Sequence, residues 1–234
     1  MKIIKIILGV IVFFTLPTLL LFGYGYFKYN EDLPKGIAGK EANTLASNML
    51  KTLNYEAYKK TNYIEWTFKK RHHYKWKKNE NICTVFWKNN KVILNLNDNT
   101  KSIVYKNNIL IAAKKAKPII DKAVSYFNND SFWLVAPYKV FDPGTTRYLV
   151  SLENNKKGLL VTYGSGGSTP GDSYLWLFGK HGKPIAFKMW TSILPIGGLE
   201  ASWNHWTTTT SAAQLPTFHQ LLFLGLELDI TQTN

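Results

Sequence analysis

The sequence has a single cysteine, Cys83, among its 234 residues. An internal disulfide is therefore excluded, and the fold has to be held together by packing. Acidic residues are also scarce, because 15 Asp and Glu stand against 29 Lys and Arg, which gives a formal net charge of +14. A chain with this charge is expected to meet an anionic partner, such as an anionic lipid surface, an acidic protein or nucleic acid.

Complete catalytic and nucleotide-binding motifs are absent as well. The stretch GGSTPGDS, Gly166–Ser173, has the glycine spacing of a phosphate-binding loop, but Asp172 stands where such a loop needs Lys. The alternating residues that follow indicate a strand rather than the required helix, so we interpret the stretch as a turn between strands. It does not satisfy G-x-S-x-G either.

The five histidines show no spacing typical of metal ligands. We therefore predict neither a metal site nor a cofactor, and we expect a protein that is not an enzyme. A hydrolase that uses a carboxylate and His205 stays open as an alternative.

The N-terminus carries a long apolar run. Ile6–Phe22 holds seventeen uncharged, mostly apolar residues, near the lower limit for crossing ~30 Å of hydrocarbon. Aromatic residues follow at once in GYGYFKY, as in an interfacial belt, and the run lacks an A-x-A cleavage site. We predict a retained transmembrane anchor at residues 1–27, with a cleaved export signal as the alternative. Lys2 and Lys5 precede the run, so the positive-inside rule predicts a single-pass protein of the cytoplasmic membrane with a periplasmic C-terminal domain.

Residues 28–38 are predicted to form a linker, and residues 39–234 one domain. Helical periodicity indicates an amphipathic helix in GKEANTLASNMLKTLN and a second helix that begins at Pro118. Alternation predicts one long strand in YIEWTFKKRHHYKWKK, and a hairpin turning at Asn89–Asn90 with Lys88 opposite Lys91. Short strand-like segments then recur from SFWLVA to the C-terminus. The fold class is α+β: a curved antiparallel sheet, or incomplete β-barrel, with two helices as a lid and an N-terminal transmembrane helix.

Large apolar residues occur at both odd and even positions of several predicted strands, for example in SYLWLF and FKMW. Both faces of the sheet must therefore be covered, and a sheet that curves around its own cavity would cover the second face. Such a cavity would be apolar and suited to an acyl chain; the alternative is that these residues fill an ordinary closed core. The predicted cavity wall comprises Trp66, Phe68, Trp76, Trp87, Trp133, Trp176 and Trp190.

The basic stretch Lys69–Lys78 mixes Lys and Arg with Tyr74 and Trp76. Stacking on bases, a plain solvated face, and contact with anionic head groups or an acidic protein all fit this composition. We do not expect nucleic acid to be the partner.

Four segments carry a resemblance to a known family: NDSFWLVAPYKVFDPG (Asn129–Gly144), GGSTPGDSYLW, the pair Met189–Trp190, and LPIGG (Leu194–Gly198). They resemble uncharacterised membrane-associated proteins of Gram-negative bacteria, whose layout is similar to the lipoprotein-carrier (LolA-like) half-barrel superfamily. The resemblance implies an incomplete barrel, with helices as a lid, whose concave side accommodates acyl chains.

These observations lead to one expected function and one alternative. The expected function is non-catalytic binding of an apolar ligand, a lipid or a lipoprotein acyl chain, by a domain anchored to the membrane through residues 6–22. The alternative is an interaction or assembly protein whose basic face docks an acidic partner or an anionic membrane. The sequence leaves the oligomeric state open.

Overall fold

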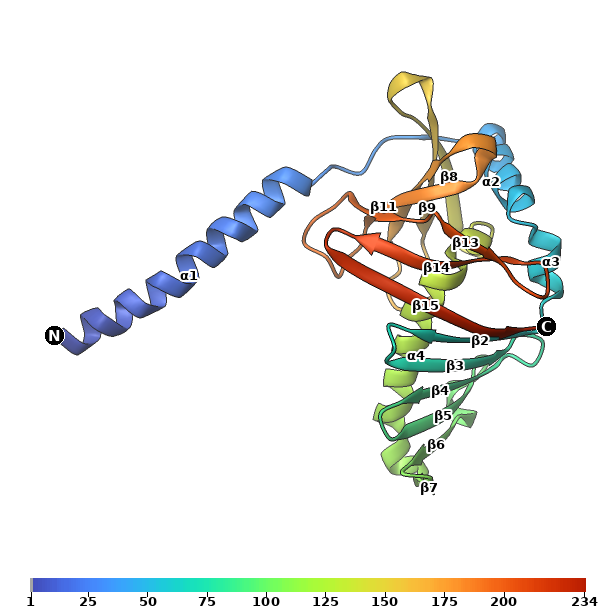
Figure 1. The fold of residues 1–234 in the computed structure, drawn as a ribbon, viewed down its shortest axis with the longest axis horizontal. Helices are drawn as coiled ribbons and strands as arrows, with labels where there is room; N and C mark the ends of the chain where they lie inside the picture. Colours follow the sequence, from blue (N-terminus) through green and yellow to red (C-terminus); the bar gives the residue numbers. More distant parts are fainter. Residues whose placement is uncertain (1) are drawn as a thin grey trace.

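A computed structural model describes residues 2–234. The first element, α1 (Lys2–Tyr29), is a helix of 28 residues that projects away from the rest of the molecule (Figure 1). Apolar side chains such as Phe13 and Phe27 are exposed, and the hydroxyls of Thr15 and Thr18 donate to carbonyl oxygens one turn earlier in the helix. The helix is long and apolar enough to cross a membrane, a property that signal sequences share with membrane anchors.

The remainder is built on one antiparallel sheet of 15 strands. Its two ends are the two-residue strands β1 and β7, which do not pair with each other within residues 2–234, so the sheet is not closed. Such short edge strands expose few unpaired backbone groups to other chains. The strands are β1 (Ile37–Ala38), β2 (Tyr63–Phe68), β3 (His72–Lys77), β4 (Ile82–Trp87), β5 (Asn90–Asn95), β6 (Ile103–Lys106), β7 (Ile109–Leu110), β8 (Thr145–Ser151), β9 (Lys157–Tyr163), β10 (Ser173–Phe178), β11 (Pro184–Trp190), β12 (Leu199–Ser202), β13 (His205–Thr208), β14 (Gln214–Leu221) and β15 (Leu224–Thr233).

Two long helices pack on this sheet. In α4 the buried side chains recur every three or four residues. This spacing places them on one face of the helix, and that face packs against the sheet. This helix crosses from β5 and β6 to β14, while α2 lies against β8 and β9 (Figure 1). The helical segments are α2 (Lys40–Thr52), α3 (Tyr55–Lys60) and α4 (Ala113–Val135), with short 3₁₀ turns η1 (Asn99–Lys101), η2 (Ala136–Lys139), η3 (Glu153–Asn155) and η4 (Lys180–Gly182). The predicted α+β class, with a large open antiparallel sheet, two long helices and an N-terminal apolar helix, is confirmed.

The prediction of one long strand over residues 63–78 is wrong, because these residues form a hairpin of β2 and β3. Lys69 and Lys70 turn the chain with φ angles of 50° and 55°, and Trp66 then pairs with Tyr74. The basic residues that interrupt the alternation are therefore the turn itself. Since Trp66 and Tyr74 pair across the hairpin, both still face the core.

The predicted hairpin of β4 and β5 is present, but its register differs from the prediction by two residues. The turn lies at Lys88–Asn89, so that Trp87 pairs with Asn90 and Val85 with Val92. Lys88, with a φ of 50°, adopts a left-handed conformation that asparagine adopts more readily. A shift of two residues leaves every side chain on its predicted face.

Two further boundaries differ from prediction. The second helix begins at Ala113 rather than Pro118, and the SFWLVA segment, predicted to be a strand, lies mostly inside α4. Phe132 and Trp133 can continue the helix because α4 packs against β14 and η2 as well as against β5. At the N-terminal boundary, α1 continues to Tyr29 and the residues of β1 already pair with β8.

Candidate functional site

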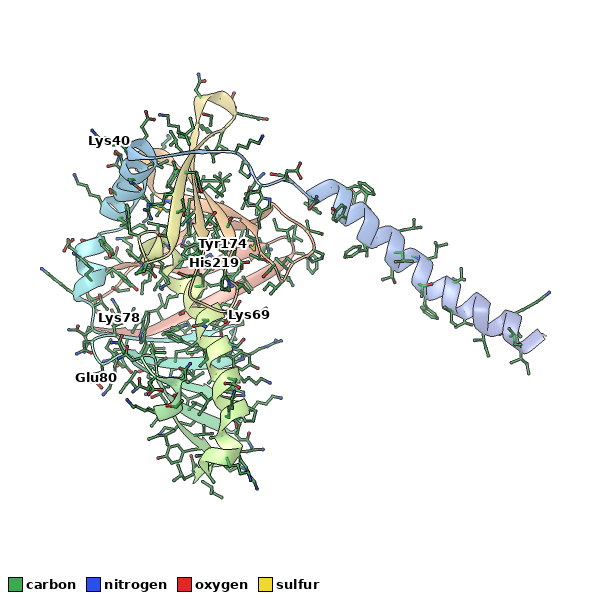
Figure 2. All side chains as sticks on the ribbon, turned by 180° about the vertical axis from the view of Figure 1, so that it is seen from behind. Lys40, Lys69, Lys78, Glu80, Tyr174 and His219 are labelled. Atoms are coloured by element: carbon green, nitrogen blue, oxygen red, sulfur yellow. The ribbon has the colours of Figure 1, made fainter. Side chains whose placement is uncertain are left out.

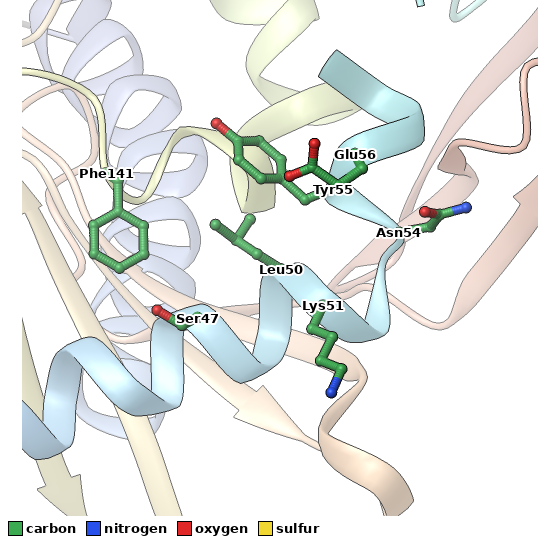
Figure 3. A pocket seen from close by; sticks show the side chains of 7 residues that line it. All are labelled: Ser47, Leu50, Lys51, Asn54, Tyr55, Glu56 and Phe141. Atoms are coloured by element: carbon green, nitrogen blue, oxygen red, sulfur yellow. The ribbon is translucent and has the colours of Figure 1, made fainter. Parts of the chain in front are cut away.

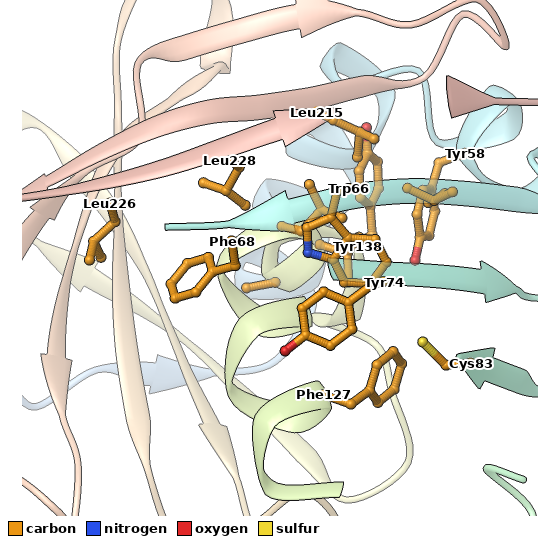
Figure 4. Close-up of a cluster of buried hydrophobic side chains, with 14 of the residues drawn as sticks. Tyr58, Trp66, Phe68, Tyr74, Cys83, Phe127, Tyr138, Leu215, Leu226 and Leu228 are labelled. Atoms are coloured by element: carbon orange, nitrogen blue, oxygen red, sulfur yellow. The ribbon is translucent and has the colours of Figure 1, made fainter. Parts of the chain in front are cut away.

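The interior between the sheet and α4 is rich in aromatic side chains, and half of it is formed by β2, β3 and β4. Trp66 stacks on Tyr74 with ring centroids 4.5 Å apart, and Phe127 of α4 packs near both rings (Figure 4). Trp76 meets the same phenylalanine edge-on at 5.3 Å. Strand alternation places these side chains on one face of the sheet, where α4 covers them.

The other half of the interior is formed by β10, β11, β14 and the residues after β12. Trp203 is fully buried at its centre, with ring centroids 5.0 Å from Trp176, 5.0 Å from Phe187 and 4.1 Å from His219. Trp133 of α4 stacks on Trp203 at 6.1 Å. α4 therefore joins the two aromatic halves into one hydrophobic cluster.

Six of the seven residues predicted to line a cavity lie in this cluster. Trp66, Phe68, Trp87 and Trp176 are buried in it, and Trp76 and Trp133 pack against it half-buried. Five of the six side chains, all except Phe68, pack against other aromatic rings, which fits the alternative of an ordinary closed core. Their assignment as a ligand wall stays a prediction.

Trp190 lies apart from the other six. It packs on a separate small cluster of Val150, Leu160 and Leu175. Its indole N–H donates to the carbonyl oxygen of Glu31 at 2.8 Å. The side chain therefore holds the segment that follows α1, a role that parity along a strand could not indicate.

Three buried indoles in the interior have no hydrogen-bond partner. The Nε1 atoms of Trp66, Trp176 and Trp203 are out of reach of any acceptor among the described residues. Buried Trp N–H groups normally find an acceptor, and leaving one unpaired costs about 1–3 kcal/mol. In contrast, the indoles of Trp190 and Trp206 donate to backbone carbonyl oxygens.

His219, fully buried on β14, faces two carbonyl oxygens. Its Nδ1 lies 2.8 Å from the oxygen of Ser202 and its Nε2 lies 2.7 Å from the oxygen of Trp133. Burial lowers the pKa of His219 to about 4, although both carbonyl groups oppose this effect. At neutral pH the ring is therefore uncharged and donates its single N–H to only one of the two oxygens. The sequence pattern did not indicate this contact between β14 and α4.

We predict that the folded chain loses stability in mild acid because of His219. Because the pKa of His219 is about 4 in the folded chain and about 6.5 when unfolded, only the unfolded state gains a proton as the pH falls below 6.5. The free energy of unfolding should drop by about 1.6 kcal/mol between pH 6.5 and pH 5 through this group. Urea unfolding at several pH values would measure the loss, and His219→Gln, which cannot titrate, should show a flatter curve. Parallel curves for the two proteins would contradict the prediction.

A second buried polar cluster links α4 to β3. The carboxylate of Asp130 accepts from the hydroxyl of Tyr74 at 2.5 Å and lies 2.7 Å from Nδ1 of His72, and Asn129 donates to its other oxygen at 2.8 Å. Asp130 is buried, and the His72 ring stacks on Tyr126. Asp130 lies inside α4, on the face that packs against the sheet. A charged residue three positions after the inward-facing Phe127 was the available signal for this site.

The glycine-rich stretch Gly166–Ser173 contains Asp172. Asp172 accepts from the hydroxyl of Thr169 and from the backbone N–H of Ser192, and strand β10 follows directly, so the glycine-rich stretch is a turn as predicted. No group of three or more His, Cys, Asp and Glu side chains suited to a metal ion occurs in residues 2–234.

A surface depression of about 540 Å³ lies beside α2 and α3 (Figure 3). It is open to solvent, and Leu50, Tyr55 and Phe141 supply its apolar part while Lys51 and Glu56 supply charge. None of the seven predicted residues lines it. The sequence pattern did not indicate this depression, because it joins α2 to the loop before β8.

A scan against protein-family models and searches of curated proteins and of solved structures found no match. The chain is therefore classified by its own architecture, as an α+β protein with an open antiparallel sheet, an aromatic interior and an N-terminal apolar helix.

Proposed function

We propose that this protein is a membrane-anchored, extracytoplasmic and non-catalytic binder of an apolar ligand, namely a lipid or a lipoprotein acyl chain. The observation that carries the proposal is the set of unpaired indole N–H groups of Trp66, Trp176 and Trp203 inside an aromatic interior. Native proteins rarely leave such donors unpaired. A ligand that has both an apolar chain and ester or amide oxygens would contact the rings and pair the donors.

Binding requires α4 to move away from the sheet, because its side chains occupy the interior. Phe127 covers Trp66, and Trp133 covers Trp203. A ligand that replaces these contacts keeps the apolar surface out of water. Each CH₂ group of the ligand that becomes buried would contribute roughly 0.8 kcal/mol to the free energy of binding.

The α1 helix supports placement at a membrane. In the proposed topology it is retained as a single-pass anchor in the cytoplasmic membrane, with the N-terminus in the cytoplasm and the sheet domain in the periplasm. The described polar side chains Thr15 and Thr18 are satisfied inside the helix, as a hydrocarbon environment demands.

The element order also supports the half-barrel proposal. An early helix, a first group of antiparallel strands, a second helix and the remaining strands of one sheet follow one another, a layout similar to the lipoprotein-carrier (LolA-like) superfamily with its helices as a lid. In that superfamily the soluble carrier loses its signal and the outer-membrane receptor has a lipidated cysteine, whereas here the only cysteine, Cys83, is buried in β4. A tethered protein would hold or hand over a lipid close to its membrane rather than carry it across the periplasm.

Photo-crosslinking of the full chain in lipid nanodiscs with a diazirine-bearing fatty acid tests the proposal. We expect adducts on peptides containing Trp66 and Trp176. Phe127→Ala, which removes a ring between α4 and Trp66, should raise the yield several-fold, whereas Phe141→Ala, on a side chain 40% exposed in the surface depression, should leave it unchanged.

Adducts confined to α1 would contradict ligand binding by the interior while leaving the anchor intact. That result, together with a stable dimer, would favour the alternative of an assembly protein with a basic docking face. Because the wild-type adduct map alone decides the question, the test does not depend on whether Phe127→Ala is stable.

A further inference from the structure

The end of α1 is clamped to the loop between β11 and β12. Glu31, two residues beyond the helix, donates its backbone N–H to the carbonyl oxygen of Gly197 at 3.0 Å and accepts from the indole of Trp190 at 2.8 Å. Its carboxylate pairs with Lys188 at 2.6 Å, and the side-chain oxygen of Asn30 accepts from the N–H of Gly197 at 2.9 Å. The helix and the sheet domain are thus joined without a free tether.

This clamp depends on two adjacent glycines. A Cβ atom on Gly198 would lie 2.7 Å from Cβ of Glu31, and one on Gly197 would lie 2.9 Å from the carbonyl oxygen of Glu31. Gly198 also has a φ of 79°, which side chains rarely adopt. The LPIGG segment therefore keeps loop 191–198 against the end of α1.

Exposed apolar side chains gather at this edge of the domain. Ile193, in the clamped loop, is 69% exposed, and Phe223, at the turn between β14 and β15, is 85% exposed. Ala201 of β12 pairs with Leu221 of β14 in antiparallel orientation. Two residues further along this pair of strands, the register places the β14–β15 turn opposite the residue that follows Gly198. Figures 1 and 2 show the β14–β15 turn on the side of the domain from which α1 extends.

A basic turn follows β2, the strand that pairs with β15. Phe68 pairs with Leu228 of β15, so the turn Lys69–Arg71 that follows it runs alongside Glu227. The Lys70 side chain is largely exposed and pairs with Glu227 at 3.2 Å. Lys69 is labelled in Figure 2 on the side of α1.

We propose that this edge, formed by loop 191–198, the turn Leu222–Leu224 and the basic turn Lys69–Arg71, rests on the bilayer that holds α1. The inference relies on the proposed function only for the statement that α1 is a membrane anchor. Isolated exposed apolar residues are ordinary, but large apolar side chains grouped at the base of a membrane helix would otherwise meet water beside the lipid surface. Apolar side chains that enter the interface, next to basic groups near anionic head groups, are the usual elements of peripheral membrane contact.

Such a contact would set the orientation of the domain. Both the clamp and the turns fix the sheet relative to the membrane surface, so a lipid leaving the bilayer would always meet the same edge. Trp190 acts here as a positioning residue, because it holds Glu31 rather than lining the interior.

Depth-dependent fluorescence quenching of the full chain tests this contact. Phe223→Cys and Ile193→Cys would each carry an NBD label in vesicles of phosphatidylcholine and phosphatidylglycerol that contain a lipid with a nitroxide at the head group. Cys83 is fully buried and should not react. The control is Lys156→Cys at the exposed turn between β8 and β9, which Figure 1 shows at the opposite end of the domain from β7 and away from α1.

We expect quenching at positions 223 and 193 to be several-fold stronger than at position 156. If α1 resists carbonate extraction but all three labels are quenched equally weakly, the contact is refuted and the anchor stands. If carbonate releases the chain, the anchor itself is refuted, and the proposed contact is refuted with it. A label at position 223 that remains quenched in the Ile193→Ser background would show that the β14–β15 turn reaches the lipid independently of the loop.

Discussion

Trp203→Ala is expected to lower the free energy of unfolding by about 4 kcal/mol, one of the largest losses for a single side chain. The indole is fully buried and lies 4.1 to 5.0 Å, between ring centroids, from His219, Phe187 and Trp176. Because these rings come from three strands, they cannot all close the space that the indole leaves. The loss therefore includes both the burial of the indole and the cavity left behind.

Urea unfolding of the full chain in a non-ionic detergent, followed by circular dichroism, would measure this loss. Phe223→Ala is the matched control, because it also removes an aromatic ring, but one that is almost entirely exposed. Its effect should stay within about 0.5 kcal/mol. Equal effects of the two substitutions would contradict the packing described for the interior.

Asp130→Ala is expected to cost about 3 kcal/mol, because it removes the acceptor for a buried hydroxyl and for a histidine. Tyr74 is fully buried, and its hydroxyl donates to Asp130 across the gap between β3 and α4. Without the carboxylate this hydroxyl stays desolvated and unpaired. Asp130→Asn, which keeps one acceptor oxygen and the side-chain shape, should cost about half as much.

A double-mutant cycle with Tyr74→Phe would isolate the hydrogen bond from the loss of volume. The two substitutions should couple by about 1 kcal/mol or more, because the single bond is broken by either of them. Additive effects within about 0.5 kcal/mol would show that the hydrogen bond between Tyr74 and Asp130 does not stabilise the folded chain. The same cycle tests whether the cluster fixes α4 against the sheet, which the proposed opening of the interior has to overcome.

Much of the fold was predictable because it depends on local periodicity. The amphipathic pattern of α2 and the alternation in β2, β4 and β5 reflect contacts between residues close in the chain, and each is present in the structure. Turn positions were less predictable. Lys88 and the pair Lys69–Lys70 adopt positive φ values that asparagine or glycine would adopt more readily, because strand pairing on both sides imposes them.

The candidate site was predictable only in part. Parity assigned Trp66, Phe68 and Trp176 to the inner face, where they lie. It could not show that Phe127 of α4 packs against Trp66, since the helix follows that hairpin by many residues. It also could not place Trp190, whose partner Glu31 is 159 residues away in the chain.

The sequence by itself determined the elements of this protein: an apolar N-terminal helix, an antiparallel sheet with aromatic side chains on its inner face, and a strongly basic surface. These follow from composition and from repeats of two or three to four residues, which act over short distances along the chain. Only the tertiary structure decided that α4 joins two aromatic halves, that three indole N–H groups are left unpaired, and that a glycine pair clamps the sheet to the end of α1. Those features depend on side chains brought together from distant segments, and no local pattern specifies which distant groups meet.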